Sequence, residues 1–266
     1  MSIRLVSACA LAFLAMVGCD SGPTSPADDP PGGDPPPAKT FQFDFTSAVS
    51  ASSSSEPAGV GPWEGAQGWI AGFSDFAPGW EETMELDAGH RPLPEGLGGE
   101  GHGLFIGATN RSDDVFMYWT GQVDGLEPET RYRVRFEVEF ATDSPAGCVG
   151  VGGPPGEAVW VKVGAVLEQP EAVVGDMGGD YWTMNLDKGN QAAGGDDALL
   201  IGDVANEASD CVGDRVWELK TLVSEEDFEI TTDATGAVWL LVGTDSGFEA
   251  RTELWYTRYE AVFEPL

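Results

Sequence analysis

The most regular hydrophobic pattern in the chain is the segment RYRVRFEVEF at residues 131–140. Every second residue is apolar, and the residues between are arginine or glutamate. Successive side chains of a strand point to opposite faces, so this alternation predicts a strand with one buried face and one face in water. Antiparallel sheets commonly have one solvated face, and the pattern therefore favours an antiparallel sheet.

Shorter apolar runs separated by turn residues follow one another from residue 41 onward. We expect further strands at Phe41–Phe45, Trp80–Leu86, Leu104–Gly107, Val115–Thr120, Ala158–Val166, Tyr181–Leu186, Ala198–Gly202, Arg215–Leu222, Asp227–Thr232, Ala237–Gly243 and Thr252–Phe263. Only Gln169–Val174 and Val204–Ser209 have a pattern compatible with a helical turn. About a dozen short strands with turn residues between them predict an all-β fold, an antiparallel β-sandwich of jelly-roll-like topology. An up-and-down barrel is the alternative.

Two resemblances support this fold. The segment Leu126–Val134 (LEPETRYRV) resembles a turn and strand found in many galactose-binding-like and carbohydrate-binding jelly rolls, which implies a sandwich. Four longer stretches are similar to a group of secreted bacterial proteins: Asn110–Met117, Cys148–Lys162, Asn185–Gly195 and Leu240–Glu249. This second resemblance implies that the chain is related to that group, and it indicates no activity.

The charge of the chain excludes one class of partner. It has 266 residues with 45 Asp and Glu against 13 Lys and Arg, a formal charge of −32. Such a surface repels a phosphate backbone, so we expect no binding to nucleic acid. Hydrophobic residues make up 42% of the chain and aromatic residues 10%, which is too much for an acidic disordered tail.

The first nineteen residues have the pattern of an export signal. Arg4 precedes an apolar stretch at residues 5–17, which is too short for a permanent membrane span. The stretch ends in Met-Val-Gly-Cys, which resembles the bacterial lipobox, although Met16 stands where leucine is usual. The resemblance implies that residues 1–18 are a signal peptide and that Cys19 is acylated. An ordinary secretory signal is the alternative.

A linker follows the proposed anchor. Residues 20–39 contain no large apolar side chain and are dominated by proline, glycine, aspartate and serine. Prolines favour an extended polyproline II chain of about 3.1 Å per residue. We therefore expect a lipid anchor and linker at 19–40, a β-sandwich domain at 41–266, and a location on the bacterial cell envelope. The sequence leaves open whether the inner or the outer membrane holds the anchor.

The cysteines agree with export. Cys9 falls in the signal peptide and Cys19 in the lipobox, which leaves Cys148 and Cys211. In an exported domain two remaining cysteines are most simply paired as a disulfide. Zinc is the alternative, but neither residue has a histidine or a second cysteine at ligand spacing.

Acidic loops make calcium the cofactor to consider. Calcium takes six to eight oxygen ligands, which loops rich in Asp, Asn and Gly can supply. Three such loops, at residues 110–114, 187–197 and 244–249, contain the candidate ligands Asp113, Asp114, Asp187, Asp196, Asp197 and Asp245. None of the loops matches the EF-hand spacing. The alternative is that these residues only form turns.

Tryptophans are the candidates for ligand binding. A flat indole packs against the apolar face of a sugar ring, while acids and amides bind the hydroxyl groups. Of the nine tryptophans, Trp160 is expected to point away from the valine face of its strand. Trp63 and Trp69 lie in a glycine-rich stretch that could present them on a loop. The alternative for each is an ordinary place in the core.

Catalytic motifs are absent from the sequence. There is no G-x-S-x-G elbow and no HExxH motif, and the chain has only two histidines. We therefore expect non-catalytic binding, with a glycan as the leading ligand. A structural or protein-interaction role in the envelope is the first alternative, and a carboxylate-based glycoside hydrolase is the second. A hydrolase requires a cleft with two carboxylates, one of them with a raised pKa.

Overall fold

The computed structural model describes residues 36–48, 59–97, 101–176 and 180–266. The signal peptide, Cys19 and most of the linker lie outside these residues, so the anchor stays a prediction. Within the described ranges the chain forms fifteen strands and no helix that could cross a membrane.

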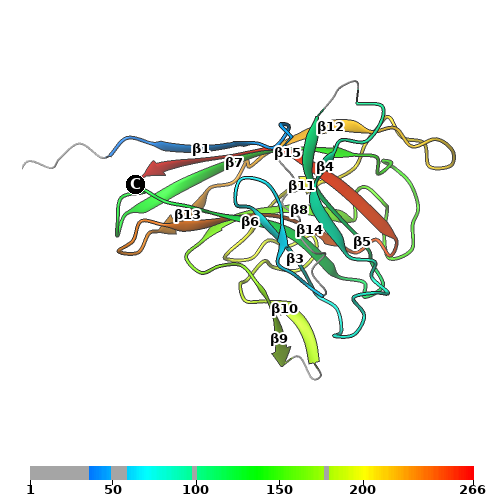
Figure 1. Cartoon of the computed structure of the whole chain (residues 1–266), viewed down its shortest axis with the longest axis horizontal. Helices are drawn as coiled ribbons and strands as arrows, with labels where there is room; N and C mark the ends of the chain where they lie inside the picture. Colours follow the sequence, from blue (N-terminus) through cyan, green and yellow to red (C-terminus); the bar gives the residue numbers. More distant parts are fainter. Residues whose placement is uncertain (1–35, 49–58, 98–100, 177–179) are drawn as a thin grey trace, which may run out of the picture. The chain divides into compact units, whose positions relative to one another are not determined.

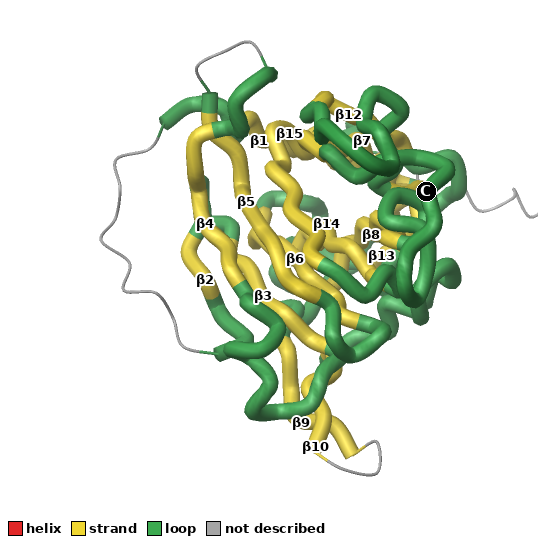
Figure 2. The backbone as a smooth tube through the Cα atoms, turned by 90° about the vertical axis from the view of Figure 1, so that its right-hand side faces the viewer, coloured by secondary structure: helices red, strands yellow, loops and turns green. Residues whose placement is uncertain are grey.

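Two antiparallel sheets face each other and form the sandwich (Figure 1). The seven-stranded sheet contains β1 (Lys39–Asp44), β4 (Asp87–Pro92), β5 (His102–Thr109), β7 (Arg131–Thr142), β12 (Glu218–Val223), β13 (Phe228–Thr231) and β15 (Arg251–Pro265). The six-stranded sheet contains β2 (Trp63–Glu64), β3 (Ile70–Ser74), β6 (Val115–Val123), β8 (Val159–Val166), β11 (Leu199–Asp203) and β14 (Val238–Ser246). A hairpin of β9 (Ala172–Asp176) and β10 (Asp180–Met184) projects from one side in both views (Figure 2).

The strand with the clearest alternation lies in the interior of its sheet. β7 pairs with β15 on one side and with β12 and β13 on the other. Its apolar side chains, such as Val134 and Phe136, are buried. Its arginines form ion pairs with acids of neighbouring segments: Arg131 with Glu229, Arg133 with Asp227 and Arg135 with Glu264. The all-β antiparallel sandwich predicted from this pattern is confirmed.

The six-stranded sheet is covered on both faces. Its inner face joins the main core through residues such as Val161, Val242 and Trp119. Its outer face carries a second small apolar cluster of Phe116, Tyr118, Leu241 and Ala198, with Met184 and Leu186 packed against it. We call residues 184–198 the cover segment, because they lie over this outer face.

Two local predictions were wrong. The segment 80–86 was expected as a strand but forms a turn, in which the Met84 amide donates to the Trp80 carbonyl. Trp80 and Met84 are four positions apart, which suits a turn of helical spacing rather than a strand. The segment 169–174 was expected as a helical turn, but Ala172 begins β9. Strands β3 and β4 were missed because glycine interrupts both of their patterns.

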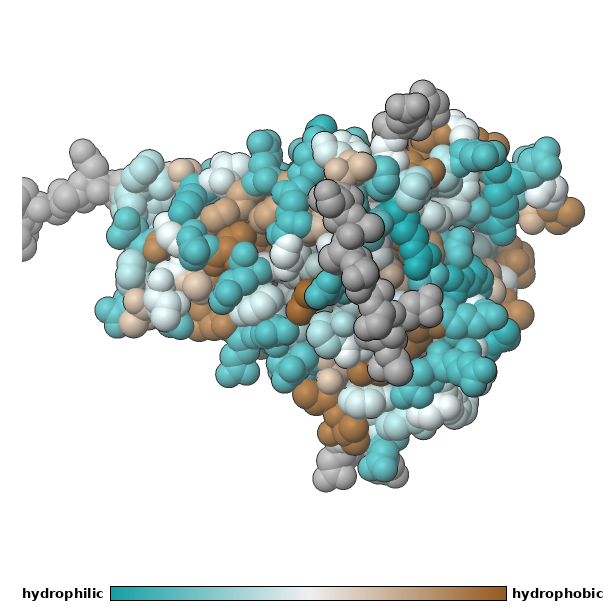
Figure 3. Space-filling model, in the orientation of Figure 1, coloured by the Kyte–Doolittle hydropathy of each residue, from teal (hydrophilic) through white to brown (hydrophobic). Residues whose placement is uncertain are grey.

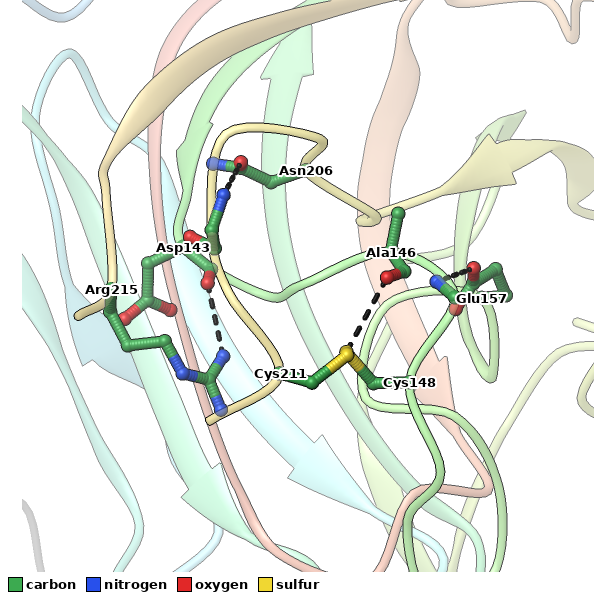
Figure 4. The surroundings of a disulfide bond; sticks show 9 residues. Asp143, Ala146, Cys148, Glu157, Asn206, Cys211 and Arg215 are labelled. Carbon is green, nitrogen blue, oxygen red and sulfur yellow. Dashed lines mark hydrogen bonds between the residues drawn. A yellow bond between two sulfur atoms is a disulfide. The ribbon is translucent and has the colours of Figure 1, made fainter. Parts of the chain in front are cut away.

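The predicted disulfide is present. Cys148 and Cys211 are bonded, with their Cα atoms 5.5 Å apart, and they join the loop after β7 to the loop before β12 (Figure 4). The flanking backbone is held by further contacts, since the Arg215 guanidinium donates to the Asp143 carbonyl.

Candidate functional site

An open pocket of about 420 Å³ lies at the side of the sandwich where β2 of one sheet approaches β4 of the other. Its lining consists of Trp63, Glu85, Leu86, Asp87 and Arg251. These residues come from β2, from the turn before β4, from β4 itself and from the first residue of β15. The pocket therefore combines an indole with two carboxylates and a guanidinium.

The indole of Trp63 is held firmly in place. The residue is 8% exposed, and its ring packs at 77° against the ring of Phe73, with the centroids 6.2 Å apart. Its Nε1 hydrogen is buried without an acceptor among the described residues. Burying a donor without a partner costs free energy, and Trp69 and Trp119 in the core share this feature.

The charged groups of the pocket are fixed by hydrogen bonds to backbone and to side chains around the pocket. The side chain of Glu85 accepts a hydrogen bond from the Thr109 hydroxyl. Arg251 donates to the backbone carbonyl of Glu85 and, through Nε, to Glu253 at 3.0 Å. Fixed polar groups lose little further conformational entropy when a ligand binds.

Asp87 is fixed in the same manner. Both of its carboxylate oxygens accept hydrogen bonds from the Arg91 guanidinium, at 2.7 and 2.5 Å. That guanidinium in turn lies over the Phe105 ring, 4.4 Å from its centroid. Planar, oriented carboxylates and guanidiniums can accept from and donate to the hydroxyl groups of a polar ligand.

A second unusual feature is a buried group of charges beneath the cover segment. Asp245 on β14 is fully buried, and its Oδ2 accepts from three donors: Lys162 Nζ at 2.9 Å, Lys188 Nζ at 2.8 Å and the Gln191 amide at 2.9 Å. Lys188 Nζ also lies 3.3 Å from Oδ2 of Asp75. We call these groups, together with Asp114, the buried charge network.

The network shifts the pKa values of its members. Burial, together with the neighbouring Asp245 carboxyl group, raises the pKa of Asp114 to about 7, and Lys188 offsets this only in part. Burial lowers the pKa of Lys162, which Asp245 only partly counters. Burial alone would lower the pKa of Lys188 as well, but Asp245 and Asp75 together raise it above the usual value.

The three tryptophans proposed from the sequence as ligand-binding residues lie in different environments. Trp63 lines the pocket but lies on β2 rather than on a loop. Trp69 is 1% exposed and packs against Phe43 and Tyr259, so the expectation that it is presented at the surface was wrong. Trp160 is half-buried on the outer side of β8, as expected, but it is not part of the pocket lining.

The six candidate calcium ligands do not converge on one point. Asp187 accepts from the amides of Gly189 and Asp196, while Asp197 accepts from the Asp187 amide at 2.8 Å. These bonds close the turn of the cover segment, and the amides of Gly189 and Asp196 lower the pKa of Asp187.

The other candidates have different neighbours. The Asp113 backbone carbonyl accepts from the Gln191 side chain. Asp114 and Asp245 do meet, but lysine ammonium groups supply the positive charge there. In the described ranges no three His, Cys, Asp or Glu residues form a group that could hold a metal. Calcium therefore stays a prediction from sequence.

Sequence reasoning missed the residues of the pocket rim and the two buried lysines. Glu85, Asp87 and Arg251 are ordinary surface residues in the sequence, and only the approach of β2 to β4 brings them together. Lys162 did carry a signal, because it stands among valines in the segment VWVKVGAV. A lysine in such a strand requires a buried partner, but the sequence does not say which acid supplies it.

Comparison with known proteins gives no family. No family model matches the chain, and no curated protein matches it. Among known structures, the chain is similar to the enzymatically active domain of tailspike protein 4 of bacteriophage CBA120, at 7% identity over 79% of this chain and 21% of that one, with a TM-score of 0.34. It is also similar to a carbohydrate-binding module of the β-sandwich superfamily (11% identity, 72% and 56% of the two chains, TM-score 0.32).

A third similar structure is the K1 cleaved adhesin domain of Lys-gingipain from Porphyromonas gingivalis, at 14% identity over 84% of this chain and 97% of that one, with a TM-score of 0.28. The chain spans about a fifth of the tailspike chain and about half of the carbohydrate-binding module chain.

Proposed function

We propose that this protein is an exported, lipid-anchored β-sandwich that binds a glycan without catalysis, and that the pocket at Trp63 is its binding site. The observation that carries the proposal is the composition of this pocket, in which a fixed indole adjoins two oriented carboxylates and a guanidinium. Sugars offer both an apolar ring face and a set of hydroxyl groups, and this combination matches both.

The hydrolase alternative is less well supported. The carboxyl group with a pKa raised to about 7, Asp114, lies in hydrogen-bond contact with Asp245. Glycoside hydrolases need two carboxyl groups about 5–10 Å apart across the sugar. Asp245 is also fully buried and bound by two lysines, so it is not available to a substrate.

One observation favours the protein-contact alternative. Val149 and Val212, each next to a cysteine of the disulfide, are 100% and 94% exposed. Polar residues cover most of the face seen in Figure 3, and apolar residues gather at a few places on it. Exposed valines beside a disulfide suit contact with another apolar surface, although single exposed apolar residues are common in proteins.

A glycan array probed with the exported protein tests the leading proposal. We expect binding to a defined set of glycans, weakened about tenfold or more in an Asp87→Ala, Arg251→Ala variant, because each lost charged hydrogen bond is worth about 1.5–3 kcal/mol. The matched control is Arg135→Ala, Glu264→Ala, which removes an exposed ion pair on β7 and β15 and should leave binding unchanged. Absence of binding to any glycan, with or without EDTA, would favour the protein-contact role.

The lipid anchor has its own test. Cells expressing the protein and fed radiolabelled palmitate should incorporate label into the wild-type chain and not into a Cys19→Ala variant, because the cysteine is the proposed attachment point. The variant should also leave the membrane fraction, since two acyl chains give stable anchoring that the acidic domain itself does not supply. Equal labelling of both chains would refute acylation at Cys19.

A further inference from the structure

Lys162 and Asp245 form an unusually close buried pair. They lie on the adjacent strands β8 and β14, on the outer side of the six-stranded sheet, one diagonal step apart in the register. Both side chains are 0% exposed, and Lys162 Nζ lies 2.9 Å from Asp245 Oδ2. An amine and a carboxyl group are thus held in contact where water is excluded.

The other neighbours of Lys162 orient its nitrogen. Nζ donates to the backbone carbonyl of Lys188 at 2.8 Å and to that of Ala193 at 2.9 Å. A neutral amine has two hydrogens and one lone pair. If the two carbonyls accept both hydrogens, the lone pair points toward Asp245. The complete burial of the Lys162 side chain favours this neutral form, because a charged group away from water loses its hydration.

The other neighbours of Asp245 prepare its carboxyl carbon, Cγ, for attack by that lone pair. Its Oδ1 is buried without a hydrogen-bond partner among the described residues, as is Oδ1 of Asp114. The two carboxyl groups are neighbours, and neither can supply a hydrogen to the other while both are ionised. A proton held by Asp114 therefore satisfies both oxygens and polarises the Asp245 carboxyl group.

We propose that Lys162 and Asp245 condense into an amide, which joins β8 to β14 by an intramolecular isopeptide bond. In this step the Nζ lone pair adds to Cγ of Asp245, so a C–N bond forms and one C–O bond breaks. The leaving oxygen takes the proton of Asp114 and one proton of Nζ and departs as water. The amine, the Asp245 carboxylate and the Asp114 acid thus become an amide, one water and the Asp114 carboxylate, without any oxidant or reductant.

Lys188 assists without being consumed. Its ammonium group donates to Oδ2 of Asp245 at 2.8 Å, where negative charge develops when the amine adds. Positive donors placed at such an oxygen stabilise the tetrahedral intermediate. Afterwards Lys188 remains next to two carboxylates, Asp75 and Asp114. The product therefore replaces a buried amine and carboxylate by a neutral amide and keeps the remaining charges close to their partner.

The bond would act together with the disulfide. It closes a loop from residue 162 to residue 245, and this loop contains Cys211, whereas Cys148 lies before it. The two cross-links therefore overlap, and neither alone duplicates the constraint of the other. A doubly cross-linked sandwich suits an exported domain, which must persist outside the cell without replacement.

Peptide mass spectrometry tests the proposal on the native protein. After reduction, alkylation and trypsin digestion, we expect residues 136–188, uncleaved at Lys162, joined to residues 221–251 with a mass one water below the sum of the two. Recovery of the separate peptide 136–162 with a free lysine from folded protein would overturn the proposal. An amide between Lys188 and Asp245 would overturn the assignment of Lys162.

Variants separate the roles of the three residues. Lys162→Arg should abolish the branched peptide, because a guanidinium keeps the charge but does not condense under these conditions. Asp114→Asn should reduce the cross-linked fraction at least tenfold, while its exposed neighbour in Asp113→Asn should leave the fraction unchanged. Full cross-linking in Asp114→Asn would show that Asp114 is not the proton donor.

Discussion

Replacing Lys188 by methionine is expected to lower the free energy of unfolding by about 3–5 kcal/mol, the usual effect of removing one partner of a buried ion pair. The Lys188 ammonium group contacts the Asp75 carboxylate and the side-chain oxygen Oδ2 of Asp245, and all three side chains are buried or nearly so. Methionine has a similar length and no charge, so it keeps the shape but leaves Asp75 without its cation. Denaturant unfolding of the wild-type protein and the variant measures the change.

The loss should grow as the pH rises. Burial already raises the pKa of Asp75, and Lys188 is the main group that lowers it again. Without Lys188 the pKa of Asp75 in the folded state rises further above its value in the unfolded chain. The variant is therefore most stable at low pH, where Asp75 is protonated. Stability is then lost as the pH rises through the folded-state pKa. We therefore expect a larger difference from wild type at pH 8 than at pH 5.

A lysine on the surface provides the control. Lys39 donates to the backbone carbonyls of Asp124 and Gly125 at an exposed place, and its ammonium group lies 5.0 Å from the Phe41 ring centroid, without contact to a buried acid in the part of the chain that the structure describes. Lys39→Met should change the free energy of unfolding by less than about 1 kcal/mol at either pH, because exposed contacts contribute little. Equal effects of the two substitutions would show that the buried charge network does not stabilise the domain.

Removing the disulfide should have an effect of similar size. Cys148 and Cys211 are 63 positions apart, and closing a loop of that length contributes about 4 kcal/mol in the chain-entropy model. We expect a Cys148→Ser, Cys211→Ser variant to unfold about 8–16 °C below wild type, given about 2–4 °C per kcal/mol for a domain of this size. Calorimetry of the two proteins measures the difference.

Chemical reduction of the wild-type protein separates two effects on the melting temperature: loss of the disulfide and replacement of the cysteine side chains by serine. Reduced wild type and the serine variant should melt at the same temperature, since both lack the constraint on the unfolded chain. A serine variant that melts well below reduced wild type would attribute the loss to the packing of Cys148, which is buried, rather than to loop closure.

The predicted parts of the structure are those for which local pattern suffices. Alternation at 131–140 led to β7 and its buried face, because the period of a strand is two wherever the strand lies. Two cysteines outside the predicted export signal led to the disulfide, because only one pairing of the two was available. Segments with interrupted alternation, such as β3 and β4, could not be recognised in this way.

The sites depend on contacts that no local pattern encodes. Trp63 and Trp69 have the same glycine-rich surroundings in the sequence, yet one lines the pocket and the other lies in the core against Tyr259. Asp245 resembled an acid of a calcium loop, but its neighbours are lysines that lie 83 and 57 positions earlier. Sequence distance does not reveal which charges meet once the cover segment folds over the sheet.

The sequence by itself determined the fold class, the disulfide and the acidic character of this protein, because each follows from periodicity, residue count or charge. The tertiary structure determined which residues meet at the pocket and in the buried charge network. It brought β2 against β4 to form the pocket, and it placed Lys162, Lys188 and Asp245 together away from water. Burial changes what these groups can do, since a lysine and an aspartate in contact without water behave differently from the same pair at the surface.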